Sequence, residues 1–253
     1  MDMHTILFLG LAGIIGGIVN AIAGGATLIT FPAMLYAGLP PITANASNAV
    51  AILPGHLFAA IADRKRLPPL DGRTKIFLAV AALGGALGAI ILLILPEKDF
   101  ILPVPALIGF ATLLFAFAPS IQARSAAKRG DQSRSKWQGA AELSIASIYG
   151  GFFGAGLGVI LTAVLSITET TDIRGIKALK NLLATGVSVA ATAIFIEQGA
   201  VRWSQTLIML VGAMLGGYAG GFLIRVLPGV WVRRTVIAAG CVMFVIYAGR
   251  YWF

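Results

Sequence analysis

Two stretches of this chain decide its fold: Leu83-Gly84-Gly85-x-x-Gly88, continuing to Leu95-Pro96, and Leu215-Gly216-Gly217-x-x-Gly220, continuing to Leu227-Pro228. Six of the fourteen aligned positions are identical, without a gap, at an offset of 132 residues. The register extends backwards, since Asn48 pairs with Asn181 at an offset of 133 and Gly16-Gly17 with Gly150-Gly151 at 134. The chain is therefore a duplicated unit, which is typical of secondary transporters when the units are apolar.

The composition places the chain in a membrane. Of its 253 residues, 58% are hydrophobic and 11% charged, whereas a soluble domain has about 25% charged residues. Apolar runs of roughly 20 residues recur along its length. One cysteine and two histidines exclude a disulfide framework and a Cys/His metal cluster. We expect an all-α integral membrane protein with segments at 5–37, 43–62, 74–95, 101–119, 139–166, 174–196, 203–226 and 231–251.

The duplication divides the chain into three parts. Residues 1–121 form the first transmembrane repeat and residues 139–253 the second. Between them, residues 122–138 form a polar stretch with five basic residues, which we interpret as a cytoplasmic basic linker.

The first segment of each repeat is interrupted at a matching place. Residues 5–37 are too long for one straight span and contain Gly24-Gly25 and Pro32. Residues 139–166 contain Gly150-Gly151 and Gly154-x-Gly156-x-Gly158. Since a glycine inside a helix costs roughly 1 kcal/mol relative to alanine, these clusters predict two broken helices, each folded back as a hairpin. Each repeat would then be a broken-helix hairpin plus three transmembrane helices.

The distribution of Lys and Arg tests the hairpins. If both first segments are hairpins without a net crossing, 16 of the 19 basic residues lie on one side and 3 on the other; if every segment crosses once, the division is 12 to 7. The positive-inside rule favours the hairpins. Each repeat then crosses an odd number of times, so the repeats are inverted and both termini lie outside. We therefore read the net charge of +9 as membrane topology, with no nucleic-acid partner. The N-terminus lacks the basic region of a signal peptide, so we expect the first segment to be retained.

The broken helices predict an anion site. A helix N-terminus exposes free N–H groups and about half a positive charge, so two such ends at mid-membrane can bind an anion. The candidate ligands at the first break are Asn20, Gly24, Gly25 and Thr27, and those at the second are Gly154 and Gly156. The alternative is that these glycines only allow close helix packing, which we favour for Gly84, Gly88, Gly212, Gly216 and Gly220.

Amides and one cation at equivalent places of the two repeats extend this site. Asn45 and Asn48 share a helix face, as do Lys180 and Asn181 with Lys177. An amide in hydrocarbon needs a partner, so these side chains face a cavity or a neighbouring helix. We include Asn45, Asn48, Lys180 and Asn181 among the substrate-binding residues. The alternatives are an interhelical hydrogen bond for the asparagines and a snorkelling topology charge for Lys180.

The sequence gives no sign of an enzyme. It contains no metal-ligand spacing and no nucleotide loop ending in Lys-Ser/Thr, and Gly154-x-Gly156-x-Gly158 follows no strand. We expect no catalytic residues, no metal and no cofactor. Proton coupling, with Glu142 or His56 as a relay, and a homodimer are further hypotheses.

These motifs resemble those of a known family. Gly16-Gly17-x-x-Asn20-Ala21-x-Ala23-Gly24-Gly25, then Pro32 and Gly38-Leu39-Pro40-Pro41-x-x-Ala44-Asn45-Ala46-x-Asn48, resemble the first repeat of the sulfite exporter TauE/SafE family. So do residues 149–158 and Lys177-Ala178-x-Lys180-Asn181 in the second repeat. The resemblance covers essentially the whole chain. It implies a bacterial inner-membrane permease for sulfite, organosulfonates or related small organic anions.

We therefore expect a multi-pass secondary transporter in the bilayer of a bacterial inner membrane that exports a small anion by alternating access. The alternatives are an anion channel of the same architecture, whose flux would not saturate, and a scaffold that transports nothing, which would lack a polar cavity between the halves.

Overall fold

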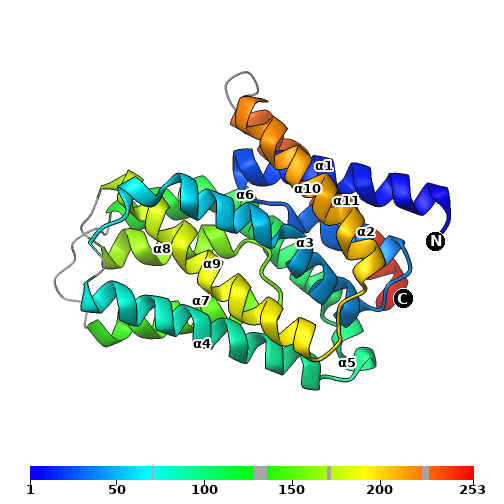
Figure 1. Ribbon diagram of the computed structural model, residues 1–253, viewed down its shortest axis with the longest axis horizontal. Coiled ribbons are helices and arrows are strands. Elements are labelled where there is room, and N and C mark those ends of the chain that lie inside the picture. Colours follow the sequence, from blue (N-terminus) through cyan, green and yellow to red (C-terminus); the bar gives the residue numbers. More distant parts are fainter. Residues whose placement is uncertain (70, 128–135, 170–171, 224–227) are drawn as a thin grey trace.

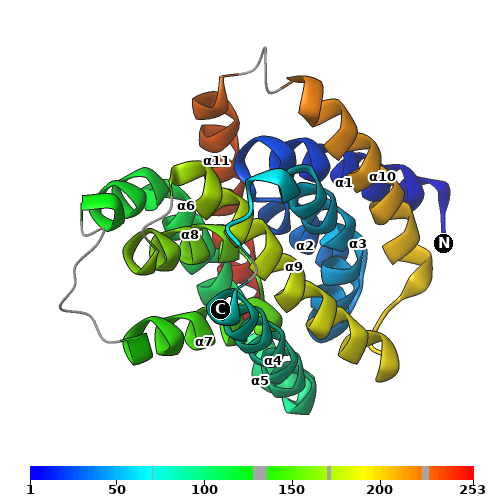
Figure 2. The same cartoon turned by 60° about the vertical axis from the view of Figure 1, so that its left-hand side comes forward.

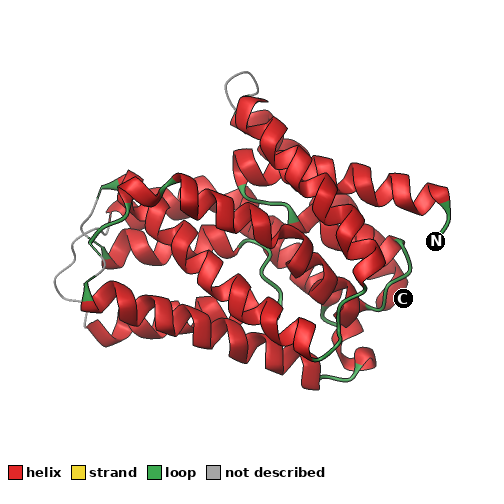
Figure 3. Cartoon of the chain, in the orientation of Figure 1, coloured by secondary structure: helices red, strands yellow, loops and turns green. Residues whose placement is uncertain are grey.

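The structure is a computed structural model that describes residues 1–69, 71–127, 136–169, 172–223 and 228–253. Within these residues every regular element is helical (Figures 1 and 3). The first half contains α1 (Met3–Ala23), α2 (Thr27–Tyr36), α3 (Pro41–Ala62), the short 3-10 helix η1 (Arg64–Arg66), α4 (Gly72–Ile94), α5 (Glu97–Ile101) and α6 (Val104–Ala127). The second half contains α7 (Lys136–Phe152), α8 (Leu157–Thr168), α9 (Ile173–Glu197), α10 (Trp203–Leu223) and α11 (Gly229–Tyr251).

Six candidate spans among the described residues are long and apolar enough to cross a bilayer: Met3–Ala23, Gly72–Ile94, Glu97–Ala127, Ile173–Glu197, Trp203–Leu223 and Gly229–Tyr251. The predicted segment at 43–62 is helix α3 but is not among the six. Asn45, Ser47 and Asn48, all buried, make α3 more polar than a lipid-exposed span. Helices α2 and α8 are apolar but short, because each is one arm of a broken segment.

The first segment breaks at Gly24, as the glycine pair predicts. Gly24 ends α1 in the left-handed conformation, with φ of 76°, and its N–H donates to the carbonyl oxygens of Val19 and Asn20. The chain then reverses, since the rings of Phe8 in α1 and Tyr36 in α2 lie 5.0 Å apart between centroids. Helices α1 and α2 therefore form a hairpin.

The second segment breaks between Phe152 and Leu157. Gly154 and Gly156 have φ of 77° and 81°, a region that L side chains rarely adopt. The Tyr149 hydroxyl donates to the carbonyl oxygen of Ala155 at 2.6 Å and so ties the turn to α7. A Cβ placed on Gly139 would lie 2.7 Å from the Thr168 methyl group, so α8 returns to the end where α7 begins.

The two halves exchange their hairpins. Helix α1 of the first half packs along α10 of the second, and α7 of the second half packs along α4 of the first (Figures 1 and 2). Glycines allow both contacts: a Cβ on Gly84 would lie 2.6 Å from Ser147, and one on Gly88 would collide with the backbone of α7. Gly212, Gly216 and Gly220 meet α1 in the same way. The packing role predicted for these five glycines is confirmed.

The loops gather at two ends of the bundle. At one, which we call the basic end, the Arg73 guanidinium donates to the Thr168 carbonyl oxygen at 2.9 Å and pairs with Glu169 at 2.9 Å. At the other, which we call the α5 end, the Trp252 indole N–H donates to the Leu102 carbonyl oxygen at 2.8 Å. Arg64, Lys65, Arg66 and Arg174 lie towards the basic end, whereas Lys98, Arg202 and Arg250 lie towards the α5 end. Linker residues 128–135 lie outside the described residues.

Candidate functional site

A cavity of about 700 Å³ lies between the two helix breaks. It extends from Gly24–Thr27 and Gly154–Gly158, along the second half of α3, to Asp63 at the basic end. Helices α9 and α10 complete its wall. Eight of the ten predicted site residues line it: Asn20, Gly24, Gly25, Thr27, Gly154, Gly156, Lys180 and Asn181. The geometry thus brings together residues that are up to 161 positions apart in the sequence.

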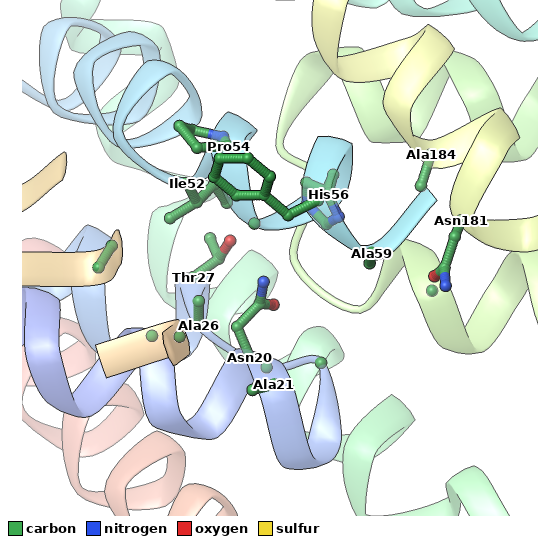
Figure 4. A pocket seen from close by; sticks show the side chains of 18 of the residues that line it. Asn20, Ala21, Ala26, Thr27, Ile52, Pro54, His56, Ala59, Asn181 and Ala184 are labelled. Atoms are coloured by element: carbon green, nitrogen blue, oxygen red, sulfur yellow. The ribbon is translucent and has the colours of Figure 1, made fainter. Parts of the chain in front are cut away.

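At the first break, polar groups without protein partners face the cavity. The N–H groups of Gly25, Ala26 and Thr27 make no hydrogen bond with any described residue. Asn20 lies close to α3, because a Cβ on Gly55 would be 2.7 Å from its Nδ2 atom. In Figure 4, Asn20 and Thr27 point towards the part of α3 that carries Ile52 and Pro54. The start of α2 therefore offers several donors to a ligand.

The second break offers a similar surface. Helix α8 begins after Gly156, and the N–H groups of Gly156 and Gly158 make no hydrogen bond within the described part of the chain. Both glycines line the cavity. A helix start with free N–H groups carries partial positive charge, so this wall of the cavity attracts anions.

Lys180 adds a full positive charge beside that helix start. A Cβ on Gly158 would lie 3.8 Å from Cδ and 3.9 Å from Nζ of Lys180. The Lys180 ammonium group makes no ion pair or hydrogen bond with the described residues. Two positive groups therefore lie side by side, and the Asp63 carboxylate interacts electrostatically with Lys180 without forming an ion pair within 4 Å.

Asn181 and Asp63 line the cavity at the basic end. The Asn181 amide donates to Oδ2 of Asp63 at 2.8 Å, and Oδ1 of Asp63 lies 3.6 Å from Arg66. Asp63 directly follows the last residue of α3 and lines the cavity. Asp63 was not among the predicted ligands. Its position directly before the basic run Arg64-Lys65-Arg66 was the available sign that its carboxylate would have a partner.

Asn45 and Asn48 do not line this cavity. Asn45 is 2% exposed and donates from Nδ2 to the Phe152 carbonyl oxygen at 2.9 Å, at the end of α7. Asn48 is 1% exposed, and its Oδ1 has no hydrogen-bond partner among the described residues. Their role as substrate ligands stays a prediction.

Several lining residues were not among the predicted ligands. His56, considered only as a proton relay, lies in the wall formed by α3 (Figure 4). Met214, Gly217 and Tyr218 of α10 line the side opposite α3. The repeated glycine motif contains Gly217, but nothing in the motif distinguishes a packed glycine from an open one.

The two copies of that motif have different surroundings. A Cβ on Gly85 would lie 2.5 Å from the Val187 carbonyl oxygen of α9, so α4 and α9 touch there. A Cβ on its counterpart Gly217 would have nothing within 4 Å. Gly217 lines the cavity together with Pro54, the counterpart of Val187. The crossing of α4 with α9 is therefore closed at Gly85, whereas the equivalent crossing of α10 with α3 is open at Gly217.

At the basic end, the carboxylate of Glu169, which follows α8, pairs with the Arg73 guanidinium of α4. Burial raises the pKa of its carboxyl group, and the nearby Arg73 guanidinium opposes that rise. The described residues contain no group of three or more His, Cys, Asp or Glu side chains that could hold a metal ion. The polar groups that line the cavity are N–H donors, the amides of Asn20 and Asn181, the Lys180 ammonium group, the Asp63 carboxylate, the His56 imidazole and the hydroxyls of Thr27 and Tyr218.

Comparisons with known proteins show which family the chain belongs to. The family model described as sulfite exporter TauE/SafE matches residues 9–247. A "probable membrane transporter protein" of Haemophilus influenzae is 28% identical over 96% of this chain and 93% of its own. The "probable membrane transporter protein ORF9" of a Sinorhizobium species is 29% identical over 87% and 83%. YfcA of Escherichia coli K12, also named a probable membrane transporter protein, is 24% identical over 90% and 84%. No solved structure matches.

These relatives are bacterial, and the family match spans the cavity and both helix breaks. Together with the six candidate membrane spans, they identify the chain as a member of the sulfite exporter TauE/SafE family, a multi-pass transporter of the bacterial inner membrane.

Proposed function

We propose that this transporter carries a small anion, such as sulfite, an organosulfonate or a related organic anion, by alternating access. One observation carries the proposal: the free N–H groups of two helix starts and the Lys180 ammonium group meet in one cavity. A permease of this kind performs no chemistry on its substrate and needs no cofactor.

Electrostatics favours an anion over a cation or a neutral solute. Each helix start is equivalent to about half a positive charge, and Lys180 adds a full one. The one lining carboxylate, Asp63, is occupied by Asn181 and Arg66. An anion between Lys180 and Gly158 would neutralise both positive groups at once and would accept charge-assisted hydrogen bonds, which are about twice as strong as neutral ones.

The arrangement of the halves supports alternating access. We infer that the repeats, residues 1–121 and 139–253, are inverted with respect to each other, because each half places its hairpin against the equivalent helix of the other. Inverted repeats around a midplane site allow one crossing to open while the other closes. The open α3–α10 crossing and the closed α4–α9 crossing are what one end state of such a cycle requires.

The distribution of basic residues indicates which end of the bundle faces the cytoplasm. Since the positive-inside rule places basic loops in the cytoplasm, we assign the basic end with its linker to the cytoplasm and both chain termini, at the α5 end in Figure 1, to the outside. The cavity reaches the basic end at Asp63, so we interpret the structure as an inward-facing state. An anion entering from the cytoplasm would meet Lys180, which suits an exporter.

A thermal-shift screen of the purified protein tests the proposal. We expect sulfite, sulfoacetate, taurine, thiosulfate or a small carboxylate to raise the melting temperature, because a ligand at 100 times its Kd stabilises the native state by about 2.7 kcal/mol. Chloride-free buffer and a Lys180→Gln variant are the controls. Shifts that are equal in the variant and the wild type would contradict the site.

Transport assays separate the proposal from its alternatives. Flux into proteoliposomes that saturates and shows counter-exchange would support a carrier, whereas flux that rises linearly with concentration would support an anion channel. Absence of both flux and binding for every anion would support a scaffold. Proton coupling and a homodimer stay predictions: a transmembrane pH gradient that leaves the flux unchanged would refute the former.

A further inference from the structure

We propose that Asn48 is a second substrate-binding amide, which lines an opposite-facing cavity at the α5 end that this structure holds closed. The inference rests on the proposed alternating access, and it assigns the residues that form the closed half of the pathway. The equivalent residue of the second repeat, Asn181, lines the cavity described above.

The burial of Asn48 is the first argument. Its side chain is 1% exposed, and its Oδ1 atom, like that of Asn45 one turn earlier, accepts no hydrogen bond from the described residues. A buried amide oxygen without a donor carries its full desolvation cost, so such groups in native structures call for an explanation. A second conformation in which Oδ1 meets water or a ligand supplies that explanation.

The repeat relation is the second argument. Asn48 stands 133 positions before Asn181, and the pairs Ala51 and Ala184, Pro54 and Val187, and Gly85 and Gly217 follow the same register within one residue. Asn181, Ala184, Pro54 and Gly217 all line the open cavity. Of their counterparts, Ala51 lines this same cavity, whereas Asn48, Val187 and Gly85 do not; these three outline the equivalent wall of the other half, with Asn48 in the place of Asn181.

The contacts made by the residues next to Asn48 on α3, and those at the closed crossing, can be broken. The Ser47 hydroxyl accepts a hydrogen bond from the Arg202 N–H at 2.9 Å, and Asn45 donates to the Phe152 carbonyl oxygen at 2.9 Å. At the crossing of α4 with α9, Gly85 lies against Val187. These are neutral hydrogen bonds and small-residue contacts, which are weaker than ion pairs with buried charges. They form a closure that a conformational change can open.

The closed cavity differs chemically from the open one. The counterpart of Lys180 is Ser47, that of His56 is Val189 and that of Asp63 is Ile196. The opposite-facing cavity thus has hydroxyl and amide groups but none of these titratable side chains. An anion held there by Asn48 lacks the ammonium group, so it binds more weakly on the outer side than on the cytoplasmic side.

Thiol labelling tests the proposal without a substrate, so its result does not depend on which anion is transported or on whether the thermal-shift screen succeeds. In a Cys241→Ser background, which removes the exposed native thiol, single variants Asn48→Cys, Asn181→Cys and Ala46→Cys are treated with a membrane-impermeant maleimide. Ala46 is 0% exposed and its counterpart Leu179 1%, so a thiol at position 46 is a control that stays buried in both states.

Each single-cysteine variant is then combined with Gly85→Ala or, as the matched control, Gly217→Ala. A Cβ at position 85 collides with α9, whereas one at position 217 enters open space. We expect Gly85→Ala to raise the labelling rate of the Asn48→Cys variant from the α5 side by about tenfold and to lower that of the Asn181→Cys variant, because separating α4 from α9 shifts the population to the opposite-facing state. We expect Gly217→Ala to leave the labelling of the Asn48→Cys variant unchanged.

Folding is checked by the melting temperature of every variant. If Gly85→Ala does not fold, Ser47→Ala replaces it, since it removes only the hydrogen bond with Arg202. The proposal would be overturned if, in a folded Gly85→Ala or Ser47→Ala protein, the thiol at position 48 stays as unreactive as the one at position 46 while the thiol at position 181 remains reactive.

Discussion

The crossing of α4 with α9 and the crossing of α3 with α10 are built from the same repeated motif, yet one is closed and the other open. A Cβ at Gly85 would meet the backbone of Val187, whereas a Cβ at Gly217 would meet nothing within 4 Å. The difference comes from the neighbouring residues. Ala82 and Ala86 of α4 have as counterparts Met214 and Tyr218 of α10, and Val187 has Pro54. Small side chains let α4 and α9 meet at Gly85, while large ones and a proline inside α3 leave space at Gly217, although α3 and α10 are in contact elsewhere.

The largest effect should come from filling the closed crossing. Gly85→Leu forces a side chain into the backbone of α9, and we expect it to destabilise the protein by about 3 kcal/mol, at the upper end for overpacking. Gly217→Leu is the matched variant, for which we expect little loss of stability but weaker anion binding, because the side chain enters the cavity. Equal falls in melting temperature for the two variants would contradict the difference between the crossings.

The next effect concerns the positive charge that only the open half has. Lys180→Gln should weaken anion binding by about 1.5–3 kcal/mol, which is at least about tenfold in Kd, because a charge-assisted contact is lost. Isothermal titration with the anion identified by the screen measures it. Lys177→Gln, on the exposed face of the same helix, controls for net charge and should leave the Kd within about twofold at moderate salt. Parallel losses in both variants would show general charge attraction in place of a site.

A smaller effect should distinguish a glycine that adopts the left-handed conformation from one that does not. Gly24 has space around it but a positive φ, so Gly24→Ala should cost about 1–2 kcal/mol through backbone strain alone. Gly72→Ala, at the start of α4, also meets open space but with no positive φ, and it should be neutral. Chemical denaturation in detergent compares the two. A neutral Gly24→Ala would mean that the first break does not depend on the left-handed turn.

The smallest effect is a pH dependence at the basic end. Because the pKa of Glu169 is raised in the folded protein, the folded state binds the proton more tightly than the unfolded state. Stability linked to this group is therefore complete below its ordinary pKa and is lost as pH rises through the raised value. We expect Glu169→Gln to remove this part of the pH dependence, by less than about 1 kcal/mol. Melting temperatures between acid and neutral pH measure it, with Glu197→Gln, an exposed carboxylate, as the control.

Much of the fold follows from the sequence because duplication and glycine clusters are local signals. They predicted both helix breaks and the packing of Gly84, Gly88, Gly212, Gly216 and Gly220. Eight of the ten residues predicted for the site line the cavity, since the breaks determine where helices start. These signals could not show that Asn48 is buried while Asn181 lines the cavity, because the repeat makes the two equivalent. Which half is open depends on contacts between helices far apart in the sequence, and a second conformation of the same sequence would reverse it.

The position of Lys180 beside the start of α8 has a practical consequence. A site with two adjacent positive groups recruits whatever anion the solution supplies, and in common buffers that anion is chloride. A competitor at high concentration masks a weak ligand, so apparent affinities measured in sodium chloride would underestimate the true ones. If the cavity binds chloride, exchange into a bulky counter-ion such as gluconate should raise the apparent affinity in every titration, and the size of that increase measures how tightly the cavity binds halide.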